Sequence, residues 1–206
     1  MTFPDSKFDQ IAAYSDAYFV HYAKAAASVD REKLAVAVEI LQGAYENKKN
    51  LYVCGNGGSA SISNHLVCDH GKLIATDTDL LPRTESLASN IEVITAIAND
   101  ISYDQVFVHQ LKIAADPGDV LITVSSSGDS ENIVQAASWA RENGMDVISM
   151  TGFSGGRSAD IASVNLHVDG DNYGVIEDVH QSLMHLMGQF MRQDRMDENV
   201  IKERKF

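Results

Sequence analysis

The sequence is poor in cysteine and proline and has no apolar run long enough to cross a membrane. Its 206 residues include two cysteines and three prolines. Cys54 and Cys68 are too few for a disulfide framework, so we expect two free thiols. We find no charged-then-apolar leader and no segment near the ~20 apolar residues of a membrane span. These absences predict a cytoplasmic protein.

Basic residues are scarce as well. Lysine and arginine together number 16, against 29 aspartates and glutamates, and the formal net charge is −13. Such a chain repels nucleic-acid phosphates unless it carries a local basic patch, and no such patch appears before the KERKF run at 202–206. We therefore expect no nucleic acid to bind, and we expect residues 195–206 to form a solvated, frayed tail.

Hydrophobic residues make up 45% of the sequence, enough for a substantial core, and we assign residues 1–206 to a single domain. Residues 1–48 show helical apolar spacing with a break and a capping residue at 28–31, which predicts an arm of two helices. Such an arm has to bury its apolar stripe, either on the body of the protein or on another subunit. Residues 49–194 form the predicted core.

Apolar strand patterns alternate with helical patterns through that core. The predicted strands are 51–54, 85–89, 120–124, 146–150 and 164–168. The predicted helices begin at residue 59 and cover 91–98, 103–114, 130–143 and 174–192, and residues 72–83 are expected to form a surface loop. This rhythm predicts an α/β fold with a doubly wound, mainly parallel sheet. Ligands in such sheets bind beyond the carboxyl ends of the strands.

A glycine-rich stretch follows the first predicted strand. The sequence NLYVCGNGGSASISN at 50–64 indicates a strand, a loop and a helix start. Glycines at 55, 57 and 58 allow a ligand to approach the backbone closely, and Ser59 or Ser61 can cap the helix. The free N–H groups and the positive dipole end of that helix favour a phosphate or a carboxylate. An ordinary strand-to-helix turn is the plain alternative.

The same arrangement occurs again in DVLITVSSSGDSEN at 119–132. No lysine follows the glycines as in a nucleoside-triphosphate loop, and neither copy has GxGxxG dinucleotide spacing. We therefore expect no nucleotide cofactor. A largely uncharged cradle of hydroxyl and backbone N–H groups suits a small phosphorylated metabolite instead.

Two helices carry acid–base side chains at four-residue spacing, which places them on one face of each helix. His65 and Asp69 follow the first glycine loop, and the last helix carries Glu177, Gln181 and His185. One such pair alone would only add a few tenths of a kcal/mol to its helix. Because both helices carry one, we interpret them as groups that move protons or hold a metal.

Three motifs carry a family resemblance: GNGGS at 55–59, SSSGDS at 125–130 and TGFSGG at 151–156. The chain resembles the sugar-isomerase (SIS) domain over nearly its whole length, and within that group it is most similar to the phosphoheptose isomerases. The resemblance implies a flavodoxin-like sheet of five strands and a homotetramer with active sites between subunits. It also implies isomerisation of sedoheptulose 7-phosphate to D-glycero-D-manno-heptose 7-phosphate through an enediolate.

The resemblance also assigns roles. The family has a His and, four positions later, a Glu, where this chain has His65 and Asp69; on the closing helix it has a Gln and, eight positions later, a His, where this chain has Glu177 and His185. In zinc-containing members these four positions surround the metal. The resemblance thus implies a divalent metal, zinc, at these four residues, with Asp69 as base and His185 as acid. Asp69 is one methylene shorter than Glu, and His70 and Glu177 are further candidate bases.

For the phosphate we predict hydroxyl and backbone N–H groups from both serine-containing loops. The set comprises Asn56, Gly57, Gly58, Ser59, Ser125, Ser126, Ser127 and Ser130. Asn99 and Asp100 resemble the Asn-Asp step that lines the sugar site of the family, although a helix cap or a turn explains Asp100 equally well.

The remaining histidines, His21, His109 and His167, are expected to be packing or surface residues; only His180 stays open, because it lies three residues after Glu177. Met184, Met187 and Met191 are expected to fill the core or an interface. Two other functions compete with a heptose isomerase. Some relatives of the domain bind a phosphosugar as a regulatory signal or act as a tetrameric scaffold for a replication initiator, and a different ketose phosphate is a third alternative. A binder would need only the serine loops, so acid–base candidates at all four family positions favour an enzyme.

Overall fold

Five parallel strands form the centre of the protein, in the order β2-β1-β3-β4-β5. The computed structural model describes residues 2–206. The strands are β1 (Asn50–Gly55), β2 (Arg83–Ser86), β3 (Val120–Val124), β4 (Asp146–Thr151) and β5 (Val164–His167). After β2 the chain crosses to the other side of β1, so the strand order reverses between β1 and β3. This confirms the predicted flavodoxin-like sheet and places the expected ligand crevice at the ends of those two strands.

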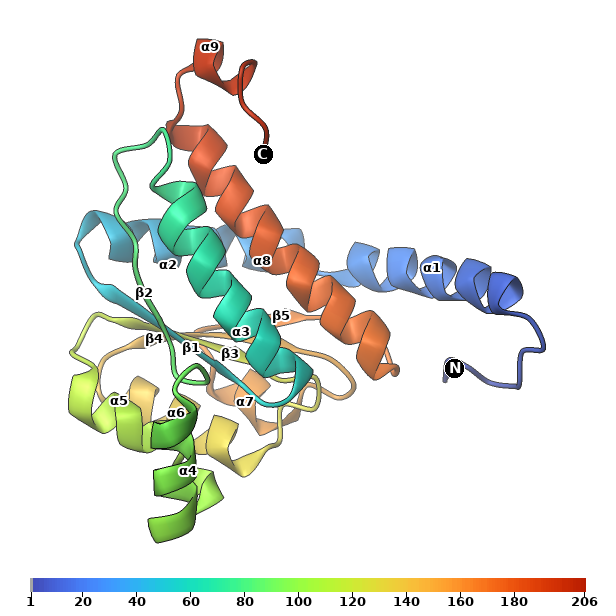
Figure 1. Ribbon diagram of the computed structural model, residues 1–206, viewed down its shortest axis with the longest axis horizontal. Coiled ribbons are helices and arrows are strands. Elements are labelled where there is room, and N and C mark those ends of the chain that lie inside the picture. Colours follow the sequence, from blue (N-terminus) through green and yellow to red (C-terminus); the bar gives the residue numbers. More distant parts are fainter. Residues whose placement is uncertain (1) are drawn as a thin grey trace.

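The central strands are apolar because helices cover both faces of the sheet (Figure 1). All five residues of β3 are buried, and Ile122 pairs with Val53 on one side and Ile148 on the other. One helical layer contains α2 (Arg31–Glu46), α3 (Gly58–Cys68) and α8 (Tyr173–Arg195); the other contains α4 (Ile91–Asp100), α5 (Val108–Ala114), α6 (Glu131–Glu142) and α7 (Gly156–Ile161). Met184, Met187 and Met191 are fully buried in the first layer, as predicted.

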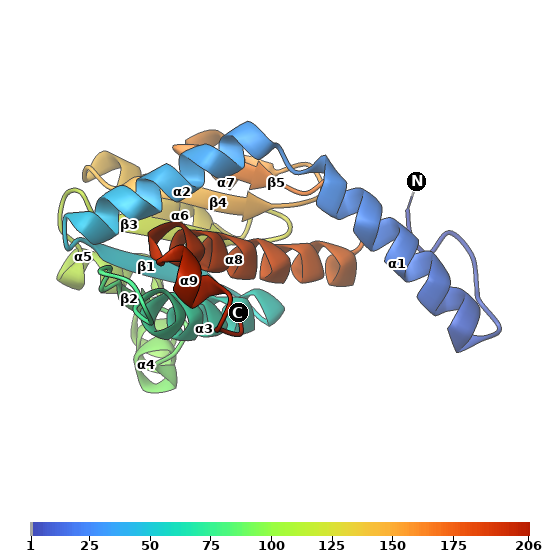
Figure 2. The same cartoon turned by 90° about the horizontal axis from the view of Figure 1, so that it is seen from above.

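The N-terminal arm has the two predicted helices, α1 (Ile11–Ser28) and α2. Asp30 begins α2 by accepting hydrogen bonds from the backbone N–H groups of Glu32 and Lys33, so the predicted break and cap are confirmed. Helix α2 packs on the sheet through its apolar stripe. Helix α1 contacts α8 and extends beyond the body of the protein (Figures 1 and 2).

Several local predictions were wrong. Gly57, not Ser59 or Ser61, precedes α3, because the chain turns there with a φ of +56° that glycine adopts without strain. The predicted helix at 103–114 is a 3₁₀ turn (Tyr103–Gln105) followed by α5, and α7 was not predicted. After Cys68 the helix continues as a π-helix (Asp69–Ile74), which occupies the start of the predicted surface loop.

The C-terminal tail is docked on the body instead of being frayed. It includes α9 (Glu198–Ile201), and the guanidinium of Arg204 donates two hydrogen bonds to Asp77 at 2.9 Å each. The buried Arg192 of α8 pairs with the same carboxylate at 3.0 Å, and the ring of Phe206 lies 5.0 Å from the Arg192 guanidinium. The guanidinium groups of Arg204 and Arg192 hold the pKa of Asp77 below its usual value. Asp77, the acidic partner that Arg192 and Arg204 share, therefore fixes the tail.

Both cysteines are free, as predicted; Cys54 is buried in β1, and Cys68 is exposed at the end of α3. Across residues 2–206 there is no helix with the length and apolar character of a membrane span.

Candidate active site

The two glycine- and serine-containing loops meet where the strand order reverses. The first connects β1 to α3, and the second connects β3 to α6. Asn56 of the first loop and Asn132 at the start of α6 exchange hydrogen bonds between their amide groups, at 2.9 and 3.0 Å. Tyr103 donates a further hydrogen bond to Asn56 at 2.9 Å. The predicted phosphate residues are thereby brought to one edge of the sheet.

The serine hydroxyl groups of the second loop have few internal partners. Ser125 and Ser126 are buried; Ser125 accepts a hydrogen bond from the Gly128 N–H at 3.2 Å, whereas the Ser126 hydroxyl has no partner within residues 2–206. Ser130 precedes α6, but its side chain makes no capping bond. Buried hydroxyl groups normally have hydrogen-bond partners, so this loop has unused donors. They lie at the N-terminus of α6, where an anion is stabilised.

Close backbone packing shapes the second loop. Gly128 and Gly156 both have positive φ, and a Cβ at Gly128 would lie 1.9 Å from the carbonyl oxygen of Gly155. A Cβ at Gly156 would lie 2.3 Å from the carbonyl oxygen of Ser127. The third motif, at 151–156, is therefore the support against which the serine loop packs, and only glycine fits at the two contact points.

Arg157 holds the serine loop in place and was missed from the sequence. Its guanidinium donates to the carboxylate and carbonyl of Asp129 at 3.0 and 2.8 Å and to Glu131 at 2.9 Å. The backbone N–H of Arg157, and then its side chain, hold the pKa of Asp129 below its usual value. The signal was a basic residue directly after a glycine pair, with two acidic residues beside the last loop serine.

Helices α3 and α8 lie side by side and run in the same direction (Figure 1). Glu177 of α8 lies against Gly58, at the first residue of α3: a Cβ at Gly58 would be 2.3 Å from the Glu177 carboxylate. Further along both helices, Gln181 and His185 reach His65 and Asp69. His65 comes seven positions after Gly58, so this second group lies about 10 Å, or two turns, from the start of the helix.

The structure brings together His65, Asp69 and His185. The Asp69 carboxylate lies 3.4 Å from His65 Nε2 and 3.3 Å from His185 Nε2. The two imidazole rings meet edge to face, with their centres 5.0 Å apart, and a ligand atom from each of the three residues lies within 4.8 Å of the others. Two imidazole nitrogens and one carboxylate are a donor set that suits zinc, so these residues fit the predicted metal.

Gln181 completes the hydrogen bonding of this group. Its amide nitrogen is placed 2.9 Å from His65 Nδ1 and 3.3 Å from His185 Nε2. It lies one turn before His185 on the same face of α8. Its contact with His65, 116 positions earlier in the sequence, connects α8 with α3.

Glu177 lies at the other end of the site, outside the group formed by His65, Asp69 and His185. Burial, with a smaller effect of the neighbouring Asp178 charge, raises the pKa of Glu177 above its usual value. Because its carboxylate lies against Gly58, it borders the loop end of α3, where phosphate binding is predicted.

Two of the remaining candidate residues point elsewhere. His70 is fully buried, with Nδ1 2.7 Å from the hydroxyl of Tyr45, so it is not placed to act as the base. His180 is also buried and lies against the sheet, with Nε2 3.2 Å from the carbonyl oxygen of Thr151. Burial lowers the pKa of each of these histidines to about 4.

Asn99 and Asp100 are exposed at the end of α4 and hydrogen-bond to each other at 2.7 Å. In the described part of the chain they make no hydrogen bond to the serine loops. It is Tyr103, three residues later, that reaches Asn56.

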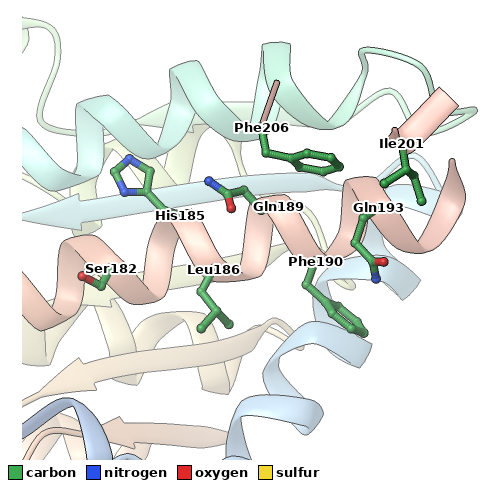
Figure 3. Close-up of a pocket in the computed structure, with 8 residues that line it drawn as sticks. All are labelled: Ser182, His185, Leu186, Gln189, Phe190, Gln193, Ile201 and Phe206. Atoms are coloured by element: carbon green, nitrogen blue, oxygen red, sulfur yellow. The ribbon is translucent and has the colours of Figure 1, made fainter. Parts of the chain in front are cut away.

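Beyond His185 a groove of about 600 Å³ follows α8 toward the C-terminal tail. Figure 3 shows His185 and Gln189 on the side of α8 that faces Phe206, with Leu186 and Phe190 on another side of the helix. Leu186 and Phe190 are each 48% exposed. Apolar surface therefore continues directly from the site.

Comparison with known proteins gives consistent matches. The SIS domain family matches residues 16–152. A probable phosphoheptose isomerase from Thermoplasma acidophilum is 34% identical over 170 residues, which cover 82% of this chain and 93% of the relative. A phosphoheptose isomerase from Bordetella avium is 36% identical over 76% of this chain and 80% of its own. The structure of phosphoheptose isomerase GmhA from Neisseria gonorrhoeae superposes with a TM-score of 0.81 at 29% identity, over 89% of this chain and all of that one.

Proposed function

The chain belongs to the SIS domain family, and from that premise we propose that it is a phosphosugar isomerase that converts sedoheptulose 7-phosphate into D-glycero-D-manno-heptose 7-phosphate. One observation carries the proposal: two helices place His65, Asp69 and His185 together, and the same helices begin at the edge where the serine loops lie. A phosphate at that edge and a carbonyl group at the three side chains would lie about two helical turns apart. An extended sugar phosphate has its reacting end and its phosphate at opposite ends in the same way.

The phosphate would be held without a dedicated cation. An anion here could accept hydrogen bonds from the N–H groups at the start of α3 and α6. It could also accept them from the hydroxyl groups of Ser59, Ser125, Ser127 and Ser130. Arg157 neutralises Asp129 and Glu131 on the outer side of the loop and so reduces their repulsion of the phosphate. Binding energy from this end of the sugar would orient the carbons that react at the other.

The isomerisation needs one base and one acid. Asp69 would take a proton from C1, next to the ketose carbonyl at C2, while His185 donates a proton to the carbonyl oxygen and an enediol forms. Removal of the O1 proton and return of a proton to C2 would then give the aldose, so no proton is gained or lost overall. Gln181 would keep the His65 and His185 rings in place during these transfers.

A divalent ion, zinc, would be held by His65, Asp69 and His185, with Glu177 as the predicted fourth ligand. When bound, zinc would supply positive charge that stabilises the enediolate oxygens. Glu177 would have to leave Gly58 to join this set. A side chain that holds the ion cannot transfer a proton unless it is first released.

We also propose that the protein works as a homotetramer in the cytoplasm. Helix α1 exposes apolar side chains, Phe19 at 64% and Val20 at 65%, and α8 exposes Leu186 and Phe190 next to His185. Contacts between subunits would bury these side chains, and another subunit would then border the site. Light scattering at micromolar concentration should report four chains.

Solvent-deuterium exchange at C1 of sedoheptulose 7-phosphate tests the enzyme proposal. Exchange reports proton removal even when net conversion is slow, and it needs no assumption about the aldose that forms. We expect exchange with the unmodified protein. Binding of the sugar phosphate without exchange would instead indicate a sensor or scaffold, and faster exchange with a shorter ketose phosphate would reassign the substrate.

A further inference from the structure

The residue after Asp69 makes a buried polar contact for which the proposed reaction has no direct use. His70 has no exposed surface, and its Nδ1 lies 2.7 Å from the hydroxyl of Tyr45, which is itself 3% exposed near the end of α2. On its other side the His70 ring packs against Gly188 of α8. Two buried polar side chains thus connect α2 with the segment that follows α3, at the point where α3 stops being a regular α-helix.

That point is the start of the π-helix. The π-helix is rare and occurs mostly as single turns inside α-helices, frequently at functional sites. The segment Asp69–Ile74 extends over six residues, and its two buried residues are His70 and Ile74. The Ile74 side chain contributes apolar packing only, and the hydrogen bond between Tyr45 and His70 is the side-chain contact that connects the buried face of this segment with α2.

Asp69 lies where α3 passes into the π-helix, and its own backbone is still α-helical: φ is −73°, ψ is −44°, and its N–H donates to the carbonyl oxygen of His65. It is the first residue of the π-helix, and its carboxylate contacts His65 and His185 although it is one methylene shorter than the glutamate expected from the family resemblance. If the winding changed before this residue, the direction of its Cα–Cβ bond would change and it would leave the face it shares with His65. We propose that the hydrogen bond between Tyr45 and His70 fixes the winding directly after Asp69, keeps Asp69 in α-helical register with His65, and thereby holds the shorter carboxylate between the two imidazoles. Tyr45 and His70 are then positioning residues.

Removal of one hydroxyl group tests the proposal, which rests on the proposed role of Asp69. Tyr45→Phe deletes the bond to His70 and keeps the aromatic ring. We expect kcat to fall about tenfold with KM within a factor of two, and zinc affinity, measured by competition with a chromophoric chelator, to fall about tenfold, as for other residues that orient metal ligands.

Tyr52→Phe is the matched control. Tyr52 is also 3% exposed, and its hydroxyl donates one hydrogen bond, to the carbonyl oxygen of Ala114 at 2.8 Å, in the opposite layer of the protein. It should lower stability about as much as Tyr45→Phe and leave kcat and zinc affinity unchanged. If Tyr45→Phe behaves like this control, the contact is structural only and the proposal is wrong.

A second variant separates orientation from damage. In the Tyr45→Phe background, Asp69→Glu lengthens the carboxylate, so its reach depends less on the winding that follows residue 69. We expect this double variant to regain most of the lost zinc affinity and kcat, and no recovery would contradict the proposal.

The two readouts keep the proposals apart. If the protein binds zinc but does not turn over the sugar phosphate, the isomerase proposal is wrong, and zinc affinity still tests the positioning role of Tyr45 and His70. A protein that turns over without metal tests it through kcat, and one that does neither removes the premise and the inference together.

Discussion

The two ends of the candidate active site are built in different ways. The loop end consists of backbone N–H groups, glycines and serine hydroxyls, held by the Asn56–Asn132 amide pair and by Arg157. The far end consists of three side chains from two helices, with Gln181 between the imidazoles. The first end suits an anion that only has to be held, and the second suits groups that change their protonation. The division predicts that binding and chemistry can be altered separately.

The largest effect should come from the far end. Asp69→Asn keeps the shape of the side chain and removes its basicity, so kcat should fall by a factor on the order of 10²–10⁴ while KM changes little. Steady-state kinetics and deuterium exchange at C1 measure both quantities. Asp178→Asn is the control, because it removes the same charge from an exposed position of α8 where the carboxylate pairs with Tyr18. If Asp69→Asn is harmless, the base is another group, with Glu177 as the first candidate.

At the loop end we expect substitutions to change KM and not kcat. Replacing both Ser127 and Ser130 by alanine removes two donors to a charged phosphate, which should raise KM on the order of a hundredfold and leave kcat within a few-fold. Ser138→Ala, two turns further along α6, should change neither. A large fall in kcat with an unchanged KM would show that the two ends are not independent.

The difference between the ends also explains what the sequence could predict. Each serine loop is a contiguous stretch whose glycines and hydroxyls carry the geometry, so strands, loops and their common edge followed from local pattern. The far end depends on how α3 sits against α8, and no local pattern reveals that Gln181 reaches His65 across 116 positions. The π-helix and the docked tail were missed for the same reason. Ile74 and Leu80 are anchored in the core by contacts distant in sequence, and Arg192 meets the acidic segment only in the folded chain.

A third test concerns the support beneath the loop end. His180 is buried with a pKa of about 4, below its ordinary value of 6.5, because burial disfavours its charged form. Between these values the unfolded chain binds a proton that the folded chain does not, so stability falls as the pH decreases from 6.5. The loss from this residue should be about 2 kcal/mol between pH 7 and pH 5. Urea unfolding at the two pH values should show that His180→Gln loses less over this range than the unmodified protein.

The smallest effect separates backbone strain from close packing at the loop end. Gly57 and Gly128 have similar positive φ angles, +56° and +66°, but a Cβ at Gly57 meets nothing within 4 Å, whereas at Gly128 it would lie 1.9 Å from the Gly155 carbonyl oxygen. Alanine at either position strains the backbone, and at Gly57 by on the order of 1–3 kcal/mol, because its ψ of −122° lies outside the left-handed α region. Only at Gly128 must the serine loop also move away from the 151–156 segment. Gly128→Ala should therefore raise KM several-fold, while Gly57→Ala lowers the melting temperature with KM closer to that of the unmodified protein. Equal KM values for the two variants would mean that contact with the third motif does not shape the phosphate site.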